Sequence, residues 1–166
     1  AAMFRLWWND TLECFGSDCS LQTEQATLFA LNVTNKSDRL SETAALLASV
    51  KHWNTTFISG IIGTRWMPEA LISAQRGDVA LALIGRDASA GQGTFSYMAE
   101  HGPGTLWEGW DCTPDSNDMR TGGSANHIMF AGGPGIFIHQ AAGVTERTWS
   151  SMGAEVAFEL DGPTAG

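Results

Sequence analysis

The sequence predicts a mainly α-helical chain that passes into a β region towards its C-terminus. Two observations carry this prediction. Apolar residues recur at helical spacing through the first half, and apolar and acidic residues alternate from Ala154 to Leu160. The order of elements shows neither βαβ alternation nor the series of strands that a sandwich needs. By length alone, the 166 residues would make one ordinary domain.

The composition excludes several classes of protein. The chain holds 9 Lys and Arg against 18 Asp and Glu, so no basic surface is available for nucleic acid or anionic lipid. Apolar residues make up 43% of the chain, too many for a disordered protein. The longest apolar runs, Val79–Ile84 and Ile128–Ala131, are far shorter than the ~20 residues that span a bilayer. The 7 Trp and 19 Gly are a combination common among carbohydrate-active proteins.

The first half of the chain predicts a succession of helices. Ser20 is placed to cap a helix that ends near Asn32. A second helix begins at Ser37 or Asp38, and its apolar residues repeat at helical spacing up to Val50.

The next segment predicts two shorter helices. Residues 57–63 are apolar and bounded by glycine, so a strand and a short helix both remain open. Pro68 suits the first turn of a helix that runs to Gln75. Asp78 then caps a short apolar helix that ends at Gly85.

A glycine-rich stretch over residues 87–125 has little periodicity and predicts a long loop. Structureless loops of this length are uncommon in compact domains and are often functional. The side chains in this stretch that suit a site are Phe95, Tyr97, Glu100, His101, Trp107, Glu108, Trp110 and Asp111. After it, Ser124 or Asn126 begins a helix towards Ala142, unless Pro134 starts a separate one.

Cysteines and glycosylation sequons indicate a secreted or extracellular protein. Cys14 and Cys19 are close enough for a small disulfide loop, although two free thiols remain the alternative. Cys112 is left over, which suggests a partner outside the chain or a buried thiol. The Asn-x-Ser/Thr sequons, each a short pattern, begin at Asn9, Asn32, Asn35 and Asn54.

The strongest chemical cluster is Thr105-Leu-Trp-Glu-Gly-Trp-Asp111. Glu108 lies between Trp107 and Trp110, and an apolar surrounding of indole rings suits a carboxyl group that transfers protons. Indole faces also pack on the apolar face of a sugar ring. The alternative is a packed pair of structural Trp residues with a hydrogen-bonded Glu.

A second cluster is Ser124-Ala-Asn-His127. His127 is placed to donate to a sugar hydroxyl, although a His in the first turn of a helix is also commonly held by the cap. His52, His101 and His139 show no ligand spacing with carboxylates or cysteines, and no glycine loop follows a strand. We therefore predict neither a metal ion nor a nucleotide cofactor.

Taken in order, several segments resemble those of the inverting α-L-rhamnosidases, a glycoside hydrolase family with an (α/α)6 barrel. The similar segments are Phe15-Gly-Ser-Asp-Cys-Ser-Leu-Gln-Thr23, Thr55-Thr-Phe-Ile-Ser-Gly-Ile-Ile-Gly-Thr64, Thr94-Phe-Ser-Tyr-Met98, Thr105-Leu-Trp-Glu-Gly-Trp-Asp111, Ser124-Ala-Asn-His127 and Ala142-Gly-Val144. The resemblance covers most of the chain, and the shared order and spacing make it more specific than any single segment.

The resemblance implies that the chain is the later part of such a barrel. Residues 1–144 would be the C-terminal part of the catalytic domain, and residues 145–166 the start of a β-sandwich region. Twelve helices with their connections need roughly 200 residues at the least. The remaining portion of the barrel would therefore come from another chain or from further sequence.

The resemblance also implies roles for the matched positions in the hydrolysis of terminal α-L-rhamnosides. Glu108 would be the general base that activates water. The predicted contacts to the sugar are His127, Phe95, Tyr97, Trp107 and Trp110. Inversion also needs a general acid about 6.5–9.5 Å from the base. The family carries this acid in the earlier half of the barrel, so it would lie outside this chain.

Four positions depart from the family pattern. Gly109 stands where the family usually has Arg, Phe95 stands where it has Trp, and Ala125 and Ile128 replace aromatic residues. These differences favour one alternative, a non-catalytic rhamnosidase-like glycoprotein with a structural or sugar-binding role. Another alternative is a different α/α-toroid sugar enzyme, such as a lyase, that shares the architecture only.

Overall fold

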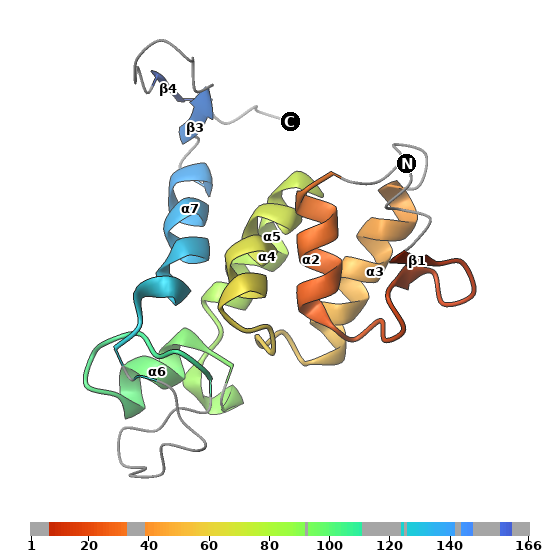
Figure 1. Cartoon of the computed structure of the whole chain (residues 1–166). Coiled ribbons are helices and arrows are strands. Elements are labelled where there is room, and N and C mark those ends of the chain that lie inside the picture. Colours follow the sequence, from red (N-terminus) through yellow and green to blue (C-terminus); the bar gives the residue numbers. More distant parts are fainter. Residues whose placement is uncertain are drawn as a thin grey trace.

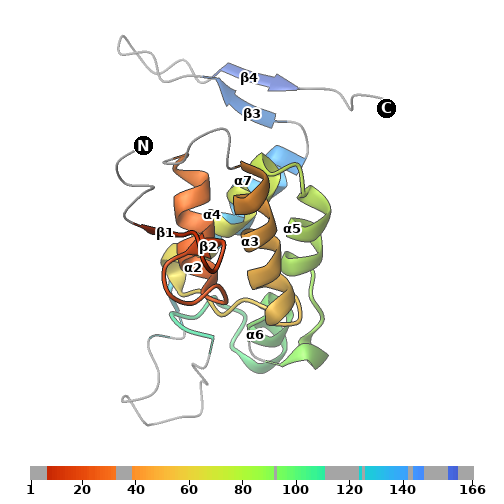
Figure 2. The ribbon, with the colours of Figure 1, turned by 90° about the vertical axis from the view of Figure 1, so that its right-hand side faces the viewer.

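Helices in two layers make up most of the described part of the chain (Figure 1, Figure 2). The computed structural model describes residues 7–32, 39–91, 93–110, 124, 126–141, 144–147 and 157–160. Its α-helices are α2 (Gln22–Ala30), α3 (Arg39–His52), α4 (Ile61–Ser73), α5 (Gly77–Ile84), α6 (Phe95–His101) and α7 (Gly132–Ala141). Two short 3-10 helices are η2 (Ala88–Ala90) and η3 (Ile128–Ala131).

Helix α4 lies at the centre of these layers. Helices α2 and α7 both pack against α4, and the three run in the same direction (Figure 1). Helices α3 and α5 run the opposite way, α3 against α2 and α5 against α4 and α7 (Figure 2). We call α2, α4 and α7 the first layer, α3 and α5 the second layer, and the two together the helical body.

The core of the helical body lies between the two layers. Its fully buried side chains come from four helices and include Phe29, Leu46, Met67, Leu71 and Leu83. Burying a side chain of this size stabilises the fold by about 1.5–3 kcal/mol. The helical spacing of apolar residues predicted α2 and α3 but only part of the core, because Phe29 and Val50 are buried whereas Leu40 is 87% exposed.

Two buried glutamines of α2 tie irregular segments to this core. The Gln25 side chain accepts a hydrogen bond from the Phe15 amide (3.0 Å) and donates one to the Phe15 carbonyl (2.8 Å). The Gln22 side chain does the same for residues 56–58, with the Thr56 carbonyl at 2.7 Å and the Ile58 amide at 3.0 Å. Each amide thus satisfies one donor and one acceptor that burial would otherwise leave unpaired.

Two predicted helix caps are wrong. Helix α2 has Leu21 at its N-cap, because the Ser20 hydroxyl donates to the Asp18 carboxylate (2.7 Å) instead. That hydrogen bond lowers the pKa of Asp18. Helix α5 begins at Gly77, and Asp78 lies in its first turn with its carboxylate paired to Arg76 (2.8 Å).

Pro68 lies inside α4 and not in its first turn, because that helix begins at Ile61. The prediction of a helix start at Pro68 is therefore wrong, and the later part of residues 57–63 is helical. A proline inside a helix leaves the carbonyl four residues earlier, here that of Thr64, without its helical partner. Gly133 of α7 packs onto this carbonyl so closely that an added Cβ would lie 2.2 Å from its oxygen.

The stretch over residues 87–125 is not structureless in its described part. The Asp87 carboxylate caps η2 by accepting from the Ser89 amide (2.8 Å). Hydrogen bonds from the Ser89 side chain and amide lower the pKa of Asp87. The buried Thr94 hydroxyl caps α6 by accepting from the Tyr97 amide (3.1 Å). The prediction of a long loop missed both elements because they are too short to show a period.

The last helix begins later than predicted. Residues 124 and 126 are not helical, η3 follows at Ile128, and α7 starts at Gly132 with Pro134 in its first turn. Of the two alternatives, a separate helix that starts at Pro134 is closer to the structure than one helix that starts at Ser124 or Asn126. Proline is tolerated there because the first amides of a helix have no intrahelical acceptor.

Two small antiparallel pairs of strands flank the helices. Strand β1 (Trp8–Asn9) pairs with β2 (Cys14–Phe15), and β3 (Val144–Arg147) pairs with β4 (Ala157–Leu160). β4 confirms the later part of the strand predicted from the alternation up to Leu160, whereas β1, β2 and β3 were not predicted. The boundary predicted after residue 144 stays a prediction.

The predicted pairing of Cys14 with Cys19 is confirmed. The two residues form a disulfide that ties β2 to the bend that follows it, with their Cα atoms 5.5 Å apart. Cys112 lies outside the described residues. Among the residues that the structure describes, no helix is both long enough and apolar enough to cross a bilayer.

Candidate functional site

The predicted site residues gather where the three helices of the first layer begin. Helices α2, α4 and α7 start at the end of the molecule where α6 lies (Figure 1). The segments that carry Glu108 and His127 cover the same end. We call residues 94–110 together with 124 and 126–127 the site segment. Side chains from residues far apart in the sequence meet there because the parallel helices present the same end.

Glu108 is held by pairing between two stretches of the site segment. The His127 amide donates to the Leu106 carbonyl (2.7 Å), and the Glu108 amide donates to the Ser124 carbonyl (2.8 Å). The Ser124 amide in turn donates to the Glu108 carboxylate at Oε2 (2.8 Å). The Glu108 side chain is exposed, so the two indoles do not enclose it and the expectation of an apolar surrounding for this carboxyl is wrong. No described residue donates to its second oxygen, Oε1.

The Ser124 hydroxyl stabilises this pairing from the other side. It accepts a hydrogen bond from the Asn126 amide (3.0 Å), which closes a tight turn just before His127. Such a turn by serine is a common local alternative to regular structure. The Ser-Ala-Asn-His segment therefore positions a carboxylate and an imidazole by its backbone rather than by a helix start.

Trp107 is fully buried among the described residues. It packs with Met98 and Phe130 in a second apolar cluster. Its predicted contact with sugar stays a prediction. Gly102 leaves the space that the indole occupies, because a Cβ there would lie 2.6 Å from Trp107 Nε1.

Trp110 joins the site segment to the helical body. Its ring stacks on Phe57 (centroids 5.3 Å apart, planes at 11°) and meets Phe130 at 4.5 Å and Phe95 at 5.3 Å. Its Nε1 donates to the Ser59 carbonyl just before α4 (2.8 Å). Phe95 and Trp110 thus form an aromatic cluster, and their predicted contact with sugar stays a prediction.

Two nitrogen atoms at the site are buried without a hydrogen-bond partner among the described residues. They are Nδ1 of His127 and Nε1 of Trp107. Nearby, the Tyr97 ring lies 4.2 Å from the His101 ring and 6.3 Å from the indole of Trp107. A half-buried tyrosine and two histidines thus lie in the same segment as the exposed Glu108.

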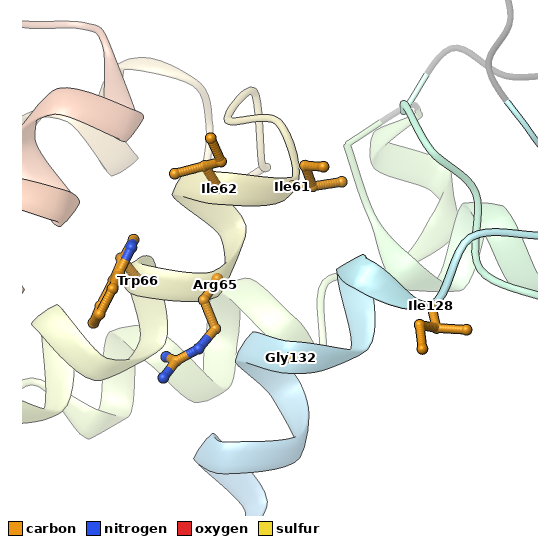
Figure 3. A pocket seen from close by; sticks show the side chains of 6 residues that line it. All are labelled: Ile61, Ile62, Arg65, Trp66, Ile128 and Gly132. Atoms are coloured by element: carbon orange, nitrogen blue, oxygen red, sulfur yellow. The ribbon is translucent and has the colours of Figure 1, made fainter.

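A groove beside the site was not found by sequence reasoning. It has a volume of about 440 Å³ and lies between the first turns of α4 and the start of α7 (Figure 3). Its lining residues are Ile61, Ile62, Arg65, Trp66, Ile128 and Gly132. Ile128 follows His127 directly in the chain. The sequence does contain a signal for this groove, because residues 62, 65 and 66 are spaced to lie on one face of a helix.

Some of the remaining predicted residues lie outside the described residues. They are Asp111, Cys112, Ala125 and Asn35, with which one sequon begins. Asn32 and Asn54 are exposed and adopt a positive φ (50° and 52°) after the ends of α2 and α3. Asn9 accepts hydrogen bonds from the Thr11 and Leu12 amides through its side-chain oxygen.

No group of three or more metal-ligating side chains occurs among the described residues. The described part of the site holds an anchored carboxylate, an imidazole and aromatic side chains, which are groups that serve acid–base catalysis or sugar binding.

The family match places the chain among helical glycosidase domains. The family described as bacterial alpha-L-rhamnosidase 6 hairpin glycosidase domain matches residues 8–142, and the chain belongs to this family. This confirms the predicted family and the partial α/α barrel. Among curated proteins, the comparison found no match to the chain.

One solved structure shows the same fold. The alpha-L-rhamnosidase from Dictyoglumus thermophilum is 24% identical, with a TM-score of 0.68. The similarity covers 87% of this chain and 15% of that enzyme's chain. The present chain therefore corresponds to a small part of the length of that enzyme.

Proposed function

We propose that this chain supplies the general base of an α-L-rhamnosidase-like active site. Glu108 takes a proton from a water molecule, which attacks the anomeric carbon of a terminal α-L-rhamnoside from the face opposite the leaving group. The bond to the leaving oxygen breaks, the anomeric configuration inverts, and a general acid protonates the leaving oxygen. That acid comes from outside this chain, together with the helices that complete the barrel.

The anchoring of Glu108 is the single observation that carries this proposal. The Ser124 amide holds Oε2 (2.8 Å), so the carboxylate has a fixed direction while its exposed side can reach water. A base that is fixed in this way needs little reorganisation before it accepts a proton. Oε1, to which no described residue donates, is the oxygen that accepts the proton from water.

The neighbouring residues bind the sugar in this proposal. His127 uses Nε2, because its Nδ1 is buried. The half-buried Tyr97 and Phe95 line the sugar pocket, and Trp110 holds the site segment on α4 through Ser59. We further propose that the protein is secreted. The disulfide between Cys14 and Cys19 and the exposed sequons at Asn32 and Asn54 support this placement.

Hydrolysis of an aryl α-L-rhamnoside by the protein with its complete barrel tests the proposal. Replacement Glu108→Gln should lower kcat by about 100- to 10,000-fold, as is typical for the loss of a general base. Glu13→Gln, at an exposed acidic residue in the turn between β1 and β2, is the matched control and should leave kcat unchanged. Proton NMR of the first product formed should show β-L-rhamnose. Full activity of the Glu108→Gln protein would refute the assignment of the base.

A second candidate function is a non-catalytic, sugar-binding or structural relative. Gly109 favours it, because this position beside Glu108 has no side chain where the family usually has Arg. In that case the protein with its complete barrel binds rhamnose without hydrolysing any aryl rhamnoside. Calorimetric titration with rhamnose, run beside the assay, separates the two functions.

A further inference from the structure

A polar and aromatic cluster at the end of α3 joins two segments that lie far apart in the sequence. Trp53 directly follows α3, and its Nε1 donates to the Ser20 carbonyl (3.0 Å) just before α2. The rings of His52 and Trp53 meet edge-on, with their centroids 5.1 Å apart. The Ser20 hydroxyl and amide both donate to the Asp18 carboxylate (2.7 and 2.9 Å). We call Asp18, Ser20, His52 and Trp53 the Trp53 cluster.

The Trp53 indole presents apolar surface in a fixed orientation. The residue is 38% exposed among the described residues. The only polar atom of its side chain, Nε1, is already paired with Ser20, so the exposed part of the ring offers apolar carbon atoms. A rigid indole loses little conformational freedom when a ligand packs on it. One exposed tryptophan is ordinary by itself, and it is the polar residues around Trp53 that point to a ligand.

The polar residues of the cluster supply hydrogen bonds beside this ring. Asp18 and His52 are both exposed. The hydrogen bonds from Ser20 lower the pKa of Asp18, and the charge of His52 lowers it further, so the carboxylate is ionised at neutral pH. A carboxylate accepts hydrogen bonds from hydroxyl groups, and an imidazole can donate one. Because an ionised carboxylate repels acidic sugars, and the chain has a net charge of −9, these groups suit a neutral sugar.

The Trp53 cluster lies at the same end of the molecule as the site segment. Helix α2 starts and α3 ends at this end (Figure 1). The residues that follow Trp53 are tied to the site segment, because the Phe57 amide donates to the Gly93 carbonyl (2.8 Å) and the Phe57 ring stacks on Trp110. A carbohydrate that extends over several rings can therefore contact Glu108 and the cluster together.

We propose that the Trp53 cluster binds a neutral sugar ring of an oligosaccharide, apart from the terminal rhamnose at Glu108. The ring packs its apolar face on the indole, while its hydroxyl groups donate to Asp18 and accept from His52. Binding of one chain at two places raises its overall affinity, so a longer carbohydrate binds more tightly than a single sugar. The inference rests on the proposed function only in that the substrate is a carbohydrate that ends in rhamnose.

Fluorine NMR reports binding at this cluster without the use of hydrolysis. The protein with its complete barrel is labelled with fluorotryptophan in a Glu108→Gln background, and a Trp53→Phe variant identifies the Trp53 resonance. A hexasaccharide of α-linked L-rhamnose should shift this resonance. Methyl α-L-rhamnoside, added until it half-saturates the protein, should leave it in place. The shift is measured with Trp53 present, so the result does not depend on the folding of a truncated variant.

Calorimetric titration in the same background measures the contribution of the indole. Trp53→Ala should weaken binding of the hexasaccharide about tenfold, the size expected for the loss of one aromatic contact, and should leave binding of methyl α-L-rhamnoside unchanged. Trp53→Phe keeps an apolar ring and should weaken binding less. Trp7→Ala, at a tryptophan that is 51% exposed, is the matched control and should bind the hexasaccharide as before.

Three outcomes overturn the inference. A Trp53 resonance that the hexasaccharide leaves unshifted means that the cluster binds no carbohydrate. A shift by methyl α-L-rhamnoside alone means that the cluster belongs to the site of the terminal rhamnose. An equal shift by a hexasaccharide of galacturonic acid contradicts the recognition of a neutral ring. Hydrolysis by the Glu108→Gln protein would instead refute the base, so a failure of the proposed function and a failure of this site are distinguished.

Discussion

The helical body and the site segment are held together by different kinds of contact. The body depends on interlocked apolar side chains from four helices and on two buried glutamines that pair with irregular backbone. The site segment depends on a few backbone hydrogen bonds between its two stretches and on one aromatic cluster around Trp110. Substitutions in the body should therefore change global stability, whereas substitutions in the site segment should mainly move Glu108 or free its carboxylate.

Phe57 belongs to both regions, and its truncation should have the largest effect. It is buried in the core of the body and stacks on Trp110. Phe57→Ala should lower the free energy of unfolding by about 3–5 kcal/mol, because the ring leaves a cavity. Urea denaturation measures this value. Leu81→Ala, at a residue of α5 that is 62% exposed, should change it by less than about 0.5 kcal/mol. Similar values for the two variants would mean that Phe57 does not join the regions.

Gly133→Ala tests the close approach of α7 to α4 and should have the next largest effect. The new Cβ would overlap the Thr64 carbonyl, so α7 must shift away from α4. We expect a loss of about 1–3 kcal/mol of stability, as for other overpacked contacts. Gly135→Ala is the matched control in the same helix, because a Cβ at Gly135 meets nothing within 4 Å. That variant should keep or raise the melting temperature. A Gly133→Ala protein as stable as the control would contradict the described packing.

Thr94→Ala should act within the site segment. It removes the hydroxyl that caps α6 and leaves the Tyr97 amide without its acceptor. The expected cost is about 1 kcal/mol, felt mainly in α6. Hydrogen exchange should accelerate for amides 95–101 and stay unchanged in α4. Thr94→Ser keeps the hydroxyl and should preserve the exchange pattern. Equal acceleration throughout the body would show that the two regions open together.

The ion pair of Arg76 with Asp78 should give the smallest effect. Hydrogen bonds from Arg76 lower the pKa of Asp78 from 3.8 to about 2. Because this pKa is lowered in the folded state, the pair stabilises the fold fully above pH 3.8 and loses that effect as the pH falls through about 2. Both side chains lie at the surface, so the change in stability is small. An NMR titration of Arg76→Gln should return the pKa of Asp78 towards 3.8 and leave that of Asp87 unchanged.

Much of the helical body could be predicted because its signals are local. The apolar spacing predicted that α3 is a helix, although the face it buries includes Leu46 and not the exposed Leu40, and the short separation of Cys14 and Cys19 was enough to suggest their disulfide. The two wrong helix caps share one cause, which is competition for the same polar groups. Asp18 takes the Ser20 hydroxyl and Arg76 takes the Asp78 carboxylate, so neither side chain is available as a cap.

The site was predicted by residue type but not by geometry. Family-like motifs identified Glu108, Ser124 and His127, whereas the backbone pairing that joins them depends on a return of the chain after residue 110. The burial of Trp107 is equally invisible in the sequence, because it depends on the space left by Gly102. The groove beside α4 exists only once α7 has packed against Thr64.

Local physical chemistry in the chain suffices for most of its helices, its disulfide and its acidic character. Each of these depends on neighbouring residues or on composition. Long-range packing decides that Trp107 is buried while Trp110 is half-buried, and that Oε2 of Glu108 accepts the hydrogen bond from Ser124. It also decides which face of α4 remains uncovered. The physical reason is that burial and pairing depend on residues tens of positions apart, as Trp110 and Ser59 show, and such contacts exist only in the folded chain.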